Sequence, residues 1–418
     1  MKKVLIMLFA MVLLLAGCST NHTEKSSHQD QGGTTPQQHS GPTKHPSKIV
    51  GKTQLFLHVT KKYEPKDFPK TSMNGEPSDI HFFKPEKDEG IRNRDYPNYD
   101  NKTFKFLSLP GSVIPPQDYY MFQKGLLAKA LAGTGYKATE IMDSGHIKIL
   151  PNLYVGYYDF AWVPLNVLTE YWSGYESMNQ ELWRDGNDYV VIANSYNGGI
   201  SMIASPNITD IRQLAGQKVG IMNPSFNIEA LFNKKLNSVG LATESAGGSV
   251  KIEMGMPGLV MNDLEDGKAK AVFAWGMYEG ELRKRLHYKE LLKWQDMGYG
   301  TKAPYVVLVV RRDILEKHPD IVQKVVQANY DASQMAIKDG EYEKPEAQRF
   351  NHYWSYYMGR KDLKAQDLRQ GDLVSIDPEI NEQYLKDIWD YMTKCGYLKV
   401  PYKFGELVNL SFQNKIVK

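Results

Sequence analysis

The sequence predicts an α/β protein built from two lobes, and three observations lead to this expectation. Short apolar runs alternate with amphipathic stretches of helical periodicity, which is how layered α/β units are built. The 418 residues include 42% hydrophobic and 24% charged residues, so the chain can form a large core divided between two units. The clearest series of strands and helices spans 208–275, in the middle of the chain. This middle segment is therefore expected to form most of one lobe.

The first 18 residues have the pattern of an export signal that ends in a lipidation site. Lys2 and Lys3 precede an apolar run over 4–15, and small residues follow it. This run is too short to favour spanning a bilayer. The ending Leu15-Ala16-Gly17-Cys18 resembles the lipobox of bacterial lipoproteins, and this resemblance implies cleavage before Cys18 and lipidation of its sulfur. The alternative is an ordinary secretory signal in which the cysteine is incidental.

The segment 19–48 contains no aliphatic or aromatic residue, so it is predicted to be a disordered tether with a reach of roughly 30 Å. Its irregularly spaced histidines favour a solvated segment over the alternative of a metal site, and no metal or cofactor is expected. These histidines are His22, His28, His39 and His45. With Cys18 assigned to lipid, Cys395 is left alone, so no intramolecular disulfide is expected.

Strand and helix signals then follow one another up to residue 163. The segment 49–102 is an extension with one strand-like run at 54–59 and many prolines. A strand at 104–109 ends in Pro110-Gly111-Ser112, and a helix at 119–131 starts after Pro115, Pro116 and Asp118 and is stopped by Gly133 and Gly135. Further strands are expected at 138–142 and 160–163.

The chain is expected to pass between the lobes twice. Strand-like runs at 190–193 and 200–204 flank a segment of turn-forming residues at 194–199, which suits a hinge. The return is placed at Ala303-Pro304-Tyr305 before a strand at 306–310, where the alternative is a tight turn before a buried strand. Helices from 312 to about 337 and at 380–392 should complete the fold.

Three motifs occur in order along the chain: GYYDFA at 156–161, DIRQLAGQKVGIM at 210–222 and LEDGKAKAVFAW at 264–275. Together they resemble the bacterial ABC-transporter solute-binding lipoproteins of the nitrate, sulfonate and taurine family, which includes thiamine-pyrimidine-like members. This resemblance covers roughly 103–398. It implies a periplasmic-binding-protein type II fold, in which each lobe is a mixed, mostly parallel sheet flanked by helices and the ligand cleft lies between the lobes.

The resulting domain plan has five parts. It assigns 1–17 to the signal peptide, 18–48 to the lipidated cysteine and linker, 49–102 to the extension, 103–197 with 308–418 to lobe I, and 198–307 to lobe II.

A helix that follows the strand at 218–222 is the main candidate for ligand contact. Apolar residues at 228, 231, 232, 236 and 239 share one face, and Gly240 ends the helix. The first turn, after Asn223-Pro224-Ser225, would present free backbone N–H groups and a positive dipole end to a polar or anionic ligand group. Ser225 is expected either to donate its hydroxyl to the ligand, to cap the helix, or to do both.

Aromatic residues supply the second candidate element. Trp162 and Trp275 each come at the end of a strand-like run and could sandwich a flat or cationic group, although a packing role is the alternative for either one. Asp159 is interpreted as a structural partner of backbone groups. The full set of expected ligand-binding residues is Gly111, Ser112, Trp162, Tyr196, Asn197, Gly198, Asn223, Ser225, Phe226, Trp275 and Tyr278.

The sequence carries no motif that predicts catalysis, such as a G-x-S-x-G elbow, a phosphate-binding loop, H-E-x-x-H or C-x-x-C. The net charge of +3 gives no argument for nucleic acid. The resemblance therefore implies a non-enzymatic, monomeric binding protein that is lipid-anchored on the extracytoplasmic face of the cell membrane, at the cell surface or in the periplasm. It would capture a sulfonate-, nitrate- or pyrimidine-like small molecule, planar or anionic, and deliver it to the ABC permease. The alternative is a ligand-sensing or structural surface lipoprotein.

Overall fold

A computed structural model describes most of the region in which strands and helices are predicted. The described residues are 48–49, 80–82, 102–108, 116–142, 153, 158–173, 188–198, 200–275, 278, 282, 288–299, 303–338, 374–375 and 377–416. The signal peptide, Cys18, the strand-like run at 54–59, Gly111 and Ser112 lie outside these residues. Within them, no helix is both long and apolar enough to cross a membrane.

One sheet has seven strands in the order β13-β6-β12-β5-β3-β4-β2. Strands β2, β4, β3 and β5 pair in parallel, whereas β12 pairs antiparallel with β5 and β6, and β13 antiparallel with β6. The bounds are β2 Ile80–Phe82, β3 Thr103–Ser108, β4 Lys137–Met142, β5 Phe160–Pro164, β6 Tyr189–Gly198, β12 Pro304–Arg311 and β13 Val374–Ser375. The extension thus contributes an edge strand, β2, for which the sequence gives no signal.

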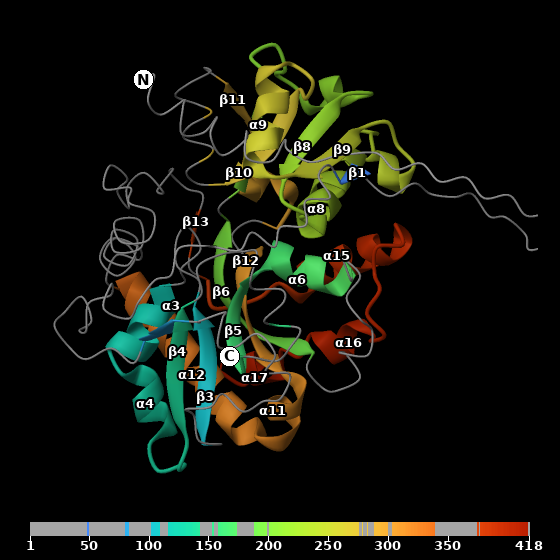
Figure 1. The fold of residues 1–418 in the computed structure, drawn as a ribbon. Helices are drawn as coiled ribbons and strands as arrows, with labels where there is room; N and C mark the ends of the chain where they lie inside the picture. Colours follow the sequence, from blue (N-terminus) through green and yellow to red (C-terminus); the bar gives the residue numbers. More distant parts are fainter. Residues whose placement is uncertain are drawn as a thin grey trace, which may run out of the picture. The chain divides into compact units, whose positions relative to one another are not determined.

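The second sheet has six strands in the order β1-β9-β8-β10-β7-β11 (Figure 1). Strands β1, β9, β8 and β10 pair in parallel, and β7 pairs antiparallel with both β10 and β11. The bounds are β1 Lys48–Ile49, β7 Ile200–Ala204, β8 Lys218–Met222, β9 Lys251–Gly255, β10 Ala271–Trp275 and β11 Lys289–Leu292. Two mixed sheets flanked by helices confirm the predicted α/β class.

The chain changes sheet between β6 and β7, and it returns between β11 and β12. The predicted break between strands at 194–199 is wrong for 194–198, because these residues complete the ten-residue strand β6, whereas the hinge at this crossing stays a prediction. Their polar side chains are buried and bonded within the fold: for example, Gln117 donates from Nε2 to the Ser195 carbonyl and accepts at Oε1 from the Ser195 hydroxyl. Turn-forming residue types therefore do not make a loop here. The lobe bounds of the domain plan remain a prediction.

Helices cover the seven-stranded sheet. The predicted helix at 119–131 is not continuous: α3 Pro116–Asp118 leads into a π-helix, η2 Tyr119–Gln123, and α4 Leu126–Leu131 follows. Gly125 interrupts the helix at φ 71°, a left-handed conformation that glycine adopts without steric cost. Helix α12, Pro319–Lys338, packs against α3, η2, α4 and β6. The other helices on this part of the chain are α6 Leu165–Ser173, α11 Arg312–Lys317, α15 Glu382–Lys394, α16 Phe404–Leu407 and α17 Ser411–Asn414.

The six-stranded sheet carries α8 Phe226–Asn237 and α9 Pro257–Glu265, together with the short 3-10 helices η3 Ile211–Leu214, η4 Glu244–Ala246 and η5 Trp294–Met297. Helix α9 packs on β8, β9 and β10. The approach is close at Gly220 of β8, because a Cβ added there would come within 2.5 Å of the Val260 side chain. This glycine therefore sets the spacing between the helix and the sheet.

Candidate functional site

The turn between β8 and α8 places three predicted site residues together. Asn223 adopts φ 59°, which asparagine tolerates better than most residues. Its backbone N–H donates to the Gly255 carbonyl at 2.7 Å. Ser225 is the N-terminal cap by position, but its hydroxyl donates to the Met222 carbonyl at 3.1 Å and makes no capping bond. A role in ligand contact would require Ser225 to give up or share this bond. Phe226 is buried and its ring lies 4.7 Å from that of Tyr397.

Helix α8 buries its polar side as well as its apolar side. The predicted apolar residues Ile228, Leu231, Phe232 and Leu236 are all buried. On the same helix Asn233 accepts at Oδ1 from the Thr243 amide at 2.9 Å, and Glu229 accepts from the Tyr391 hydroxyl at 2.9 Å. Sequence reasoning assigned these polar positions no role, because an amphipathic pattern places them on the solvent side.

Asn227, in the first turn of α8, differs from these bonded neighbours. Its side chain has no exposed surface, yet neither Nδ2 nor Oδ1 makes a hydrogen bond with any part of the chain that the structure describes. The Tyr384 hydroxyl lies beside this amide but donates to the Pro304 carbonyl at 3.2 Å. Burial raises the pKa of Tyr384 well above its usual value, and the neighbouring Asn227 amide partly offsets this rise. Tyr384 therefore stays protonated and able to donate.

Helix α6 begins in a similar way after β5, in the other sheet. Asn166 is its second residue, just as Asn227 is the second residue of α8, and the two helices contact each other. Asn166 is also buried, and its Oδ1 finds no partner among the described residues. Two helices that follow strands of different sheets thus each bury an incompletely bonded asparagine in the first turn.

The end of β6 adds a further group of predicted residues. Asn197 accepts at Oδ1 from Asn194 Nδ2 at 2.9 Å, whereas its own Nδ2 makes no bond within the described residues. Asn197 pairs in register with Pro304, so it lies in the same part of the fold as the Tyr384 bond. Tyr196 is buried with its ring 5.8 Å from Tyr305, and Gly198 takes a left-handed φ of 85°. The Tyr305 hydroxyl is buried and lacks a partner among the described side chains and backbone.

The two tryptophans are not in equivalent positions. Trp162 lies inside β5 rather than after it, is fully buried, and donates from Nε1 to Asn329 Oδ1 at 3.1 Å. It packs near Phe106 and Phe122 in the core. Trp275 is the last residue of β10, and its side chain lies outside the described part of the structure. Tyr278 is partly buried against the core. Trp162 thus occupies its packing alternative in this structure, and its ligand contact remains a prediction.

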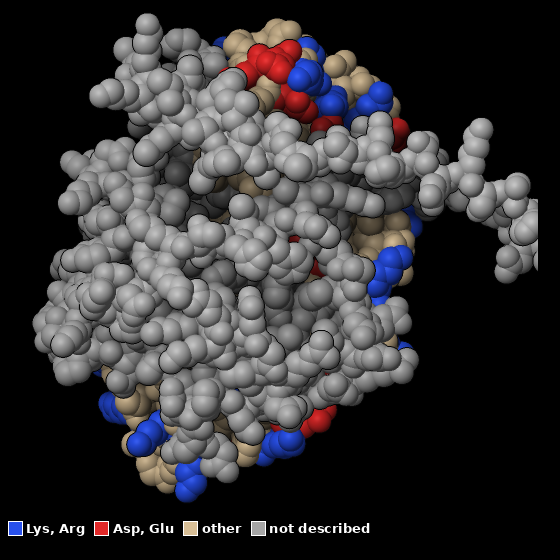
Figure 2. Space-filling view, viewed as in Figure 1, with Lys and Arg blue, Asp and Glu red and all other residues tan. Residues whose placement is uncertain are grey.

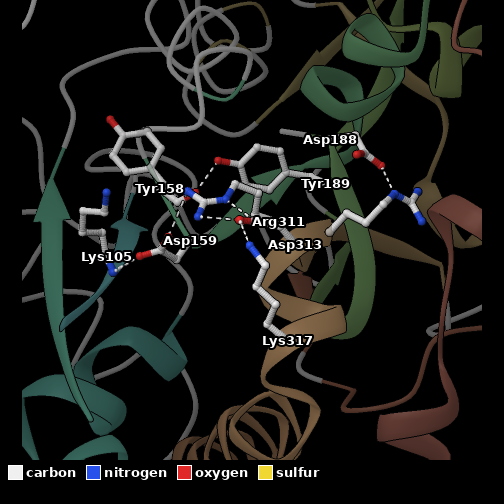
Figure 3. Close-up of polar contacts among 9 residues, drawn as sticks. Lys105, Tyr158, Asp159, Asp188, Tyr189, Arg311, Asp313 and Lys317 are labelled. Atoms are coloured by element: carbon white, nitrogen blue, oxygen red, sulfur yellow. Dashed lines mark hydrogen bonds and ion pairs between the residues drawn. The ribbon is translucent and has the colours of Figure 1, made fainter. Parts of the chain in front are cut away.

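A bonded ion cluster lies at the start of β5 (Figure 3). Asp159 accepts from the Lys105 backbone N–H at 2.9 Å and pairs with Arg311 at 3.1 Å. Arg311 also binds Asp313 at 2.5 Å, and the Tyr189 hydroxyl donates to the Tyr158 carbonyl. These contacts join β3, β5, β6 and β12. They confirm that Asp159 is a structural partner of backbone groups.

The described surface carries both signs of charge. In the view of Figure 2, acidic and basic side chains lie side by side at the top, in the region where Figure 1 draws α9. Lys268 pairs with Asp266 at 2.7 Å in this part of the chain. Among the residues that the structure describes, no group of three or more His, Cys, Asp or Glu side chains could hold a metal ion.

Comparisons with known proteins agree with the resemblance seen in the sequence. Residues 188–342 match the family described as NMT1/THI5 like. None of the curated proteins compared with the chain matches it. Among solved structures, the chain is similar to a periplasmic sulfonate-binding protein, SsuA, from Methylobacillus flagellatus, with a TM-score of 0.55, 14% identity, and coverage of 76% of this chain and 94% of that one.

Two further structures match over a similar extent. The periplasmic aliphatic sulphonate binding protein SsuA from Escherichia coli has a TM-score of 0.50 and 16% identity, covering 72% of this chain and 90% of that one. The ligand-binding component of an ABC-type import system from Staphylococcus aureus has a TM-score of 0.51 and 16% identity, covering 75% and 99%. These matches confirm the periplasmic-binding-protein type II fold. By name, these three structures are of binding proteins or a ligand-binding component.

Proposed function

We propose that this chain is the extracytoplasmic solute-binding lipoprotein of an ABC importer, and that it binds a small organic molecule and delivers it to the permease. The observation that carries the proposal is the pair of buried asparagines, Asn166 and Asn227, in the first turns of two contacting helices from different sheets. Matches that span nearly the whole length of solved sulfonate-binding proteins support the same function.

In the proposed mechanism the two lobes close on the ligand by a motion about the two crossings between the sheets. A ligand that contacts the first turns of both α6 and α8 stabilises the state in which these helices lie together, so binding selects that closed state. Dissociation in the micromolar range requires about 8 kcal/mol of net binding free energy. Helix N-termini contribute roughly 0.3–2 kcal/mol each to a polar ligand group, and buried hydrogen bonds and aromatic contacts would supply the rest.

The remaining predicted site residues belong to this proposal. Gly111 and Ser112 would follow β3 at the same edge of the sheet as α6, and Trp275 ends β10 with Tyr278 three residues later in the chain. We expect Trp275→Ala to weaken ligand binding while leaving the unfolding transition nearly unchanged. Equal binding by this variant and by the wild type would remove Trp275 from the site.

The proposed anchor is the lipid on Cys18, which holds a monomer at the outer face of the cell membrane. Replacing Cys18 by serine removes the thiol that would be lipidated, so the protein should move from the membrane fraction to the soluble extracytoplasmic fraction. Cell fractionation and mass spectrometry of the N-terminal peptide test this. Retention of Cys18→Ser in the membrane fraction would contradict the anchor without affecting the proposed binding function.

A thermal-shift screen tests the binding function. A ligand that binds only the native state raises the melting temperature by mass action. The full chain, purified in detergent and freed of carried-over ligand by unfolding and refolding, is screened against sulfonates, nitrate, pyrimidines, flavins and small aromatic acids and amides. A saturable shift would support a solute-binding protein. The absence of a shift with every compound would favour a structural lipoprotein, and binding without loss of uptake on gene deletion would favour a sensor.

A further inference from the structure

We propose that Asn227 contacts the ligand, and that it selects a neutral group with a hydrogen-bond donor beside an acceptor, such as a primary amide or a cyclic amide. This inference rests on the proposed solute-binding function and narrows the range of ligands expected for it. It distinguishes such compounds from sulfonates, carboxylates and nitrate, which offer only acceptors to the protein.

Asn227 and Asn233 of α8 differ in their hydrogen bonding. Asn233 and Asn227 are both buried in α8. Asn233 is bonded at Oδ1 to the amide and the hydroxyl of Thr243, at 2.9 and 3.2 Å. Asn227 makes no such bond from either amide atom within the described residues. One asparagine is therefore part of the protein's own bonding, whereas the other is available to a partner.

A buried amide without partners is costly and uncommon. Most buried polar side-chain atoms in proteins have at least one hydrogen-bond partner, and those that lack one call for a specific explanation. An amide side chain can donate twice and accept twice, and apart from its contact with the Tyr384 hydroxyl the Asn227 amide leaves this capacity unused among the described residues. A leucine of similar size would fill the position without this cost. The position thus favours a residue that gains its bonds only when a ligand is bound.

The chemistry of the first turn defines the complementary group. The Ile228 and Glu229 amides donate to the Ser225 carbonyl, so the N–H groups of Phe226 and Asn227 are those that helix geometry leaves without an intrahelical acceptor. These N–H groups and Asn227 Nδ2 suit a ligand acceptor, while Asn227 Oδ1 requires a ligand donor. An asparagine amide pairs with such an edge through two bonds, as it does with adenine.

The charge nearby does not favour an anion. Lys234, two turns further along α8, pairs with Asp387 of α15 at 2.6 Å and donates to the Tyr299 hydroxyl at 2.6 Å. Burial would raise the pKa of Asp387, but the bonds from Lys234 and Tyr299 outweigh it and lower the pKa, so the carboxylate stays charged. The charge of Lys234 is thereby balanced within the protein.

Tyr384 of α15 lies beside the Asn227 amide. Its ring is fully buried and packs edge-on against Tyr299 at 4.9 Å, and its hydroxyl is bonded to the Pro304 carbonyl at the start of β12. Helix α15, which contacts α8, is thereby bonded to the point where the chain returns to the seven-stranded sheet. Ligand binding at Asn227 would consequently be sensitive to the relative position of the two sheets.

Binding of matched probes by the full chain tests the proposal. Nicotinamide and uracil carry the proposed edge, whereas nicotinate, pyridine-3-sulfonate and nitrate do not. We expect calorimetry to show binding of at least one of the first pair and weaker or no binding of the second set. In Asn227→Leu the dissociation constant should rise about 10- to 100-fold. The melting temperature of the ligand-free variant should stay unchanged or rise.

The control variant is Asn233→Leu, which should lower the melting temperature and leave the dissociation constant unchanged, because it leaves the Thr243 amide without its partner. Asn227→Ala serves as a second variant if Asn227→Leu does not fold. Binding of nicotinate, pyridine-3-sulfonate or nitrate that Asn227→Leu retains would overturn the inference and uphold the proposed function. A fall in stability of Asn227→Leu equal to that of Asn233→Leu would assign Asn227 a structural role. If no probe and no compound of the wider screen binds to the wild type, both proposals fail.

Discussion

The buried polar groups near the two ends of β5 differ in whether they are bonded within the protein. At the start of the strand, Asp159, Arg311 and Asp313 bind one another and nearby backbone groups. After its end, Asn166 in α6 and Asn227 in the contacting helix α8 stay buried with amide atoms that lack partners in the described structure. In the first region the polar groups bind one another and hold the strands together. In the second region the asparagine amide atoms are available to bind a ligand.

This difference provides a way to separate stability from ligand binding. A buried charge or hydrogen bond that the protein satisfies internally contributes to the native state, and removing one partner leaves the other uncompensated. A buried polar group with no internal partner destabilises the native state until a ligand satisfies it. Substitutions in the two regions should therefore have effects of different kind as well as of different size.

The largest effect is expected for Arg311→Met. The change leaves Asp159 and Asp313 buried without their cation, which should lower the free energy of unfolding by about 3–5 kcal/mol. Urea denaturation measures this loss. Lys317→Met is the control, because this exposed lysine lies 3.6 Å from Asp313 and should change the free energy by no more than about 1 kcal/mol. Equal effects from both variants would contradict the role given to the cluster.

An intermediate effect is expected for Trp162→Phe. The indole N–H is the donor to the buried Asn329 Oδ1, so its loss should lower the free energy of unfolding by about 1–3 kcal/mol. Ligand affinity should be unchanged if Trp162 acts in the core. The opposite result, weaker binding with no loss of stability in chemical denaturation, would move Trp162 into the ligand site.

The smallest changes in stability are expected for two tyrosines, one whose hydroxyl is bonded and one whose hydroxyl has no partner among the described residues. Tyr189→Phe removes a hydroxyl that donates to the Tyr158 carbonyl in the ion cluster, and it should cost about 1 kcal/mol. Tyr305→Phe removes a buried hydroxyl that has no partner among the described residues, and it should leave the stability within about 0.5 kcal/mol of wild type. Equal losses in the two variants would show that Tyr305 is satisfied in solution.

Much of the fold follows from local patterns in the sequence. The strands predicted at 104–109, 138–142 and 306–310 are present with bounds shifted by two residues or fewer. Alternating or continuous apolar runs are a local signal of a buried strand. The turn at Asn223 and the amphipathic helix after it are likewise correct. The break predicted at 194–198 is wrong, since asparagine, serine and glycine indicate turns locally, whereas here the carbonyls of Asn194 and Ser195 accept from Asn329 and Gln117 of distant helices.

The candidate site was only partly predictable. The turn at 223–227 is predicted to carry ligand contacts through Ser225 and Phe226, and this stays a prediction. Asn166 and Tyr384 were missed, and Asn227 was given no ligand-binding role of its own. A polar residue inside an amphipathic helix gives the same signal whether it faces water or is buried beneath another helix. Helix α8 contacts α6 and α15, and such contacts between distant segments leave no local trace in one sequence, so the burial of Asn227 could not be predicted.

The most direct measurement is a crystal structure of the protein with the compound that gives the largest saturable thermal shift. We predict that the ligand lies against the first turns of α6 and α8 and that its donor and acceptor atoms are within hydrogen-bond distance of Asn227 Oδ1 and Nδ2. A ligand bound elsewhere, with the Asn227 amide in contact only with protein atoms, would contradict it.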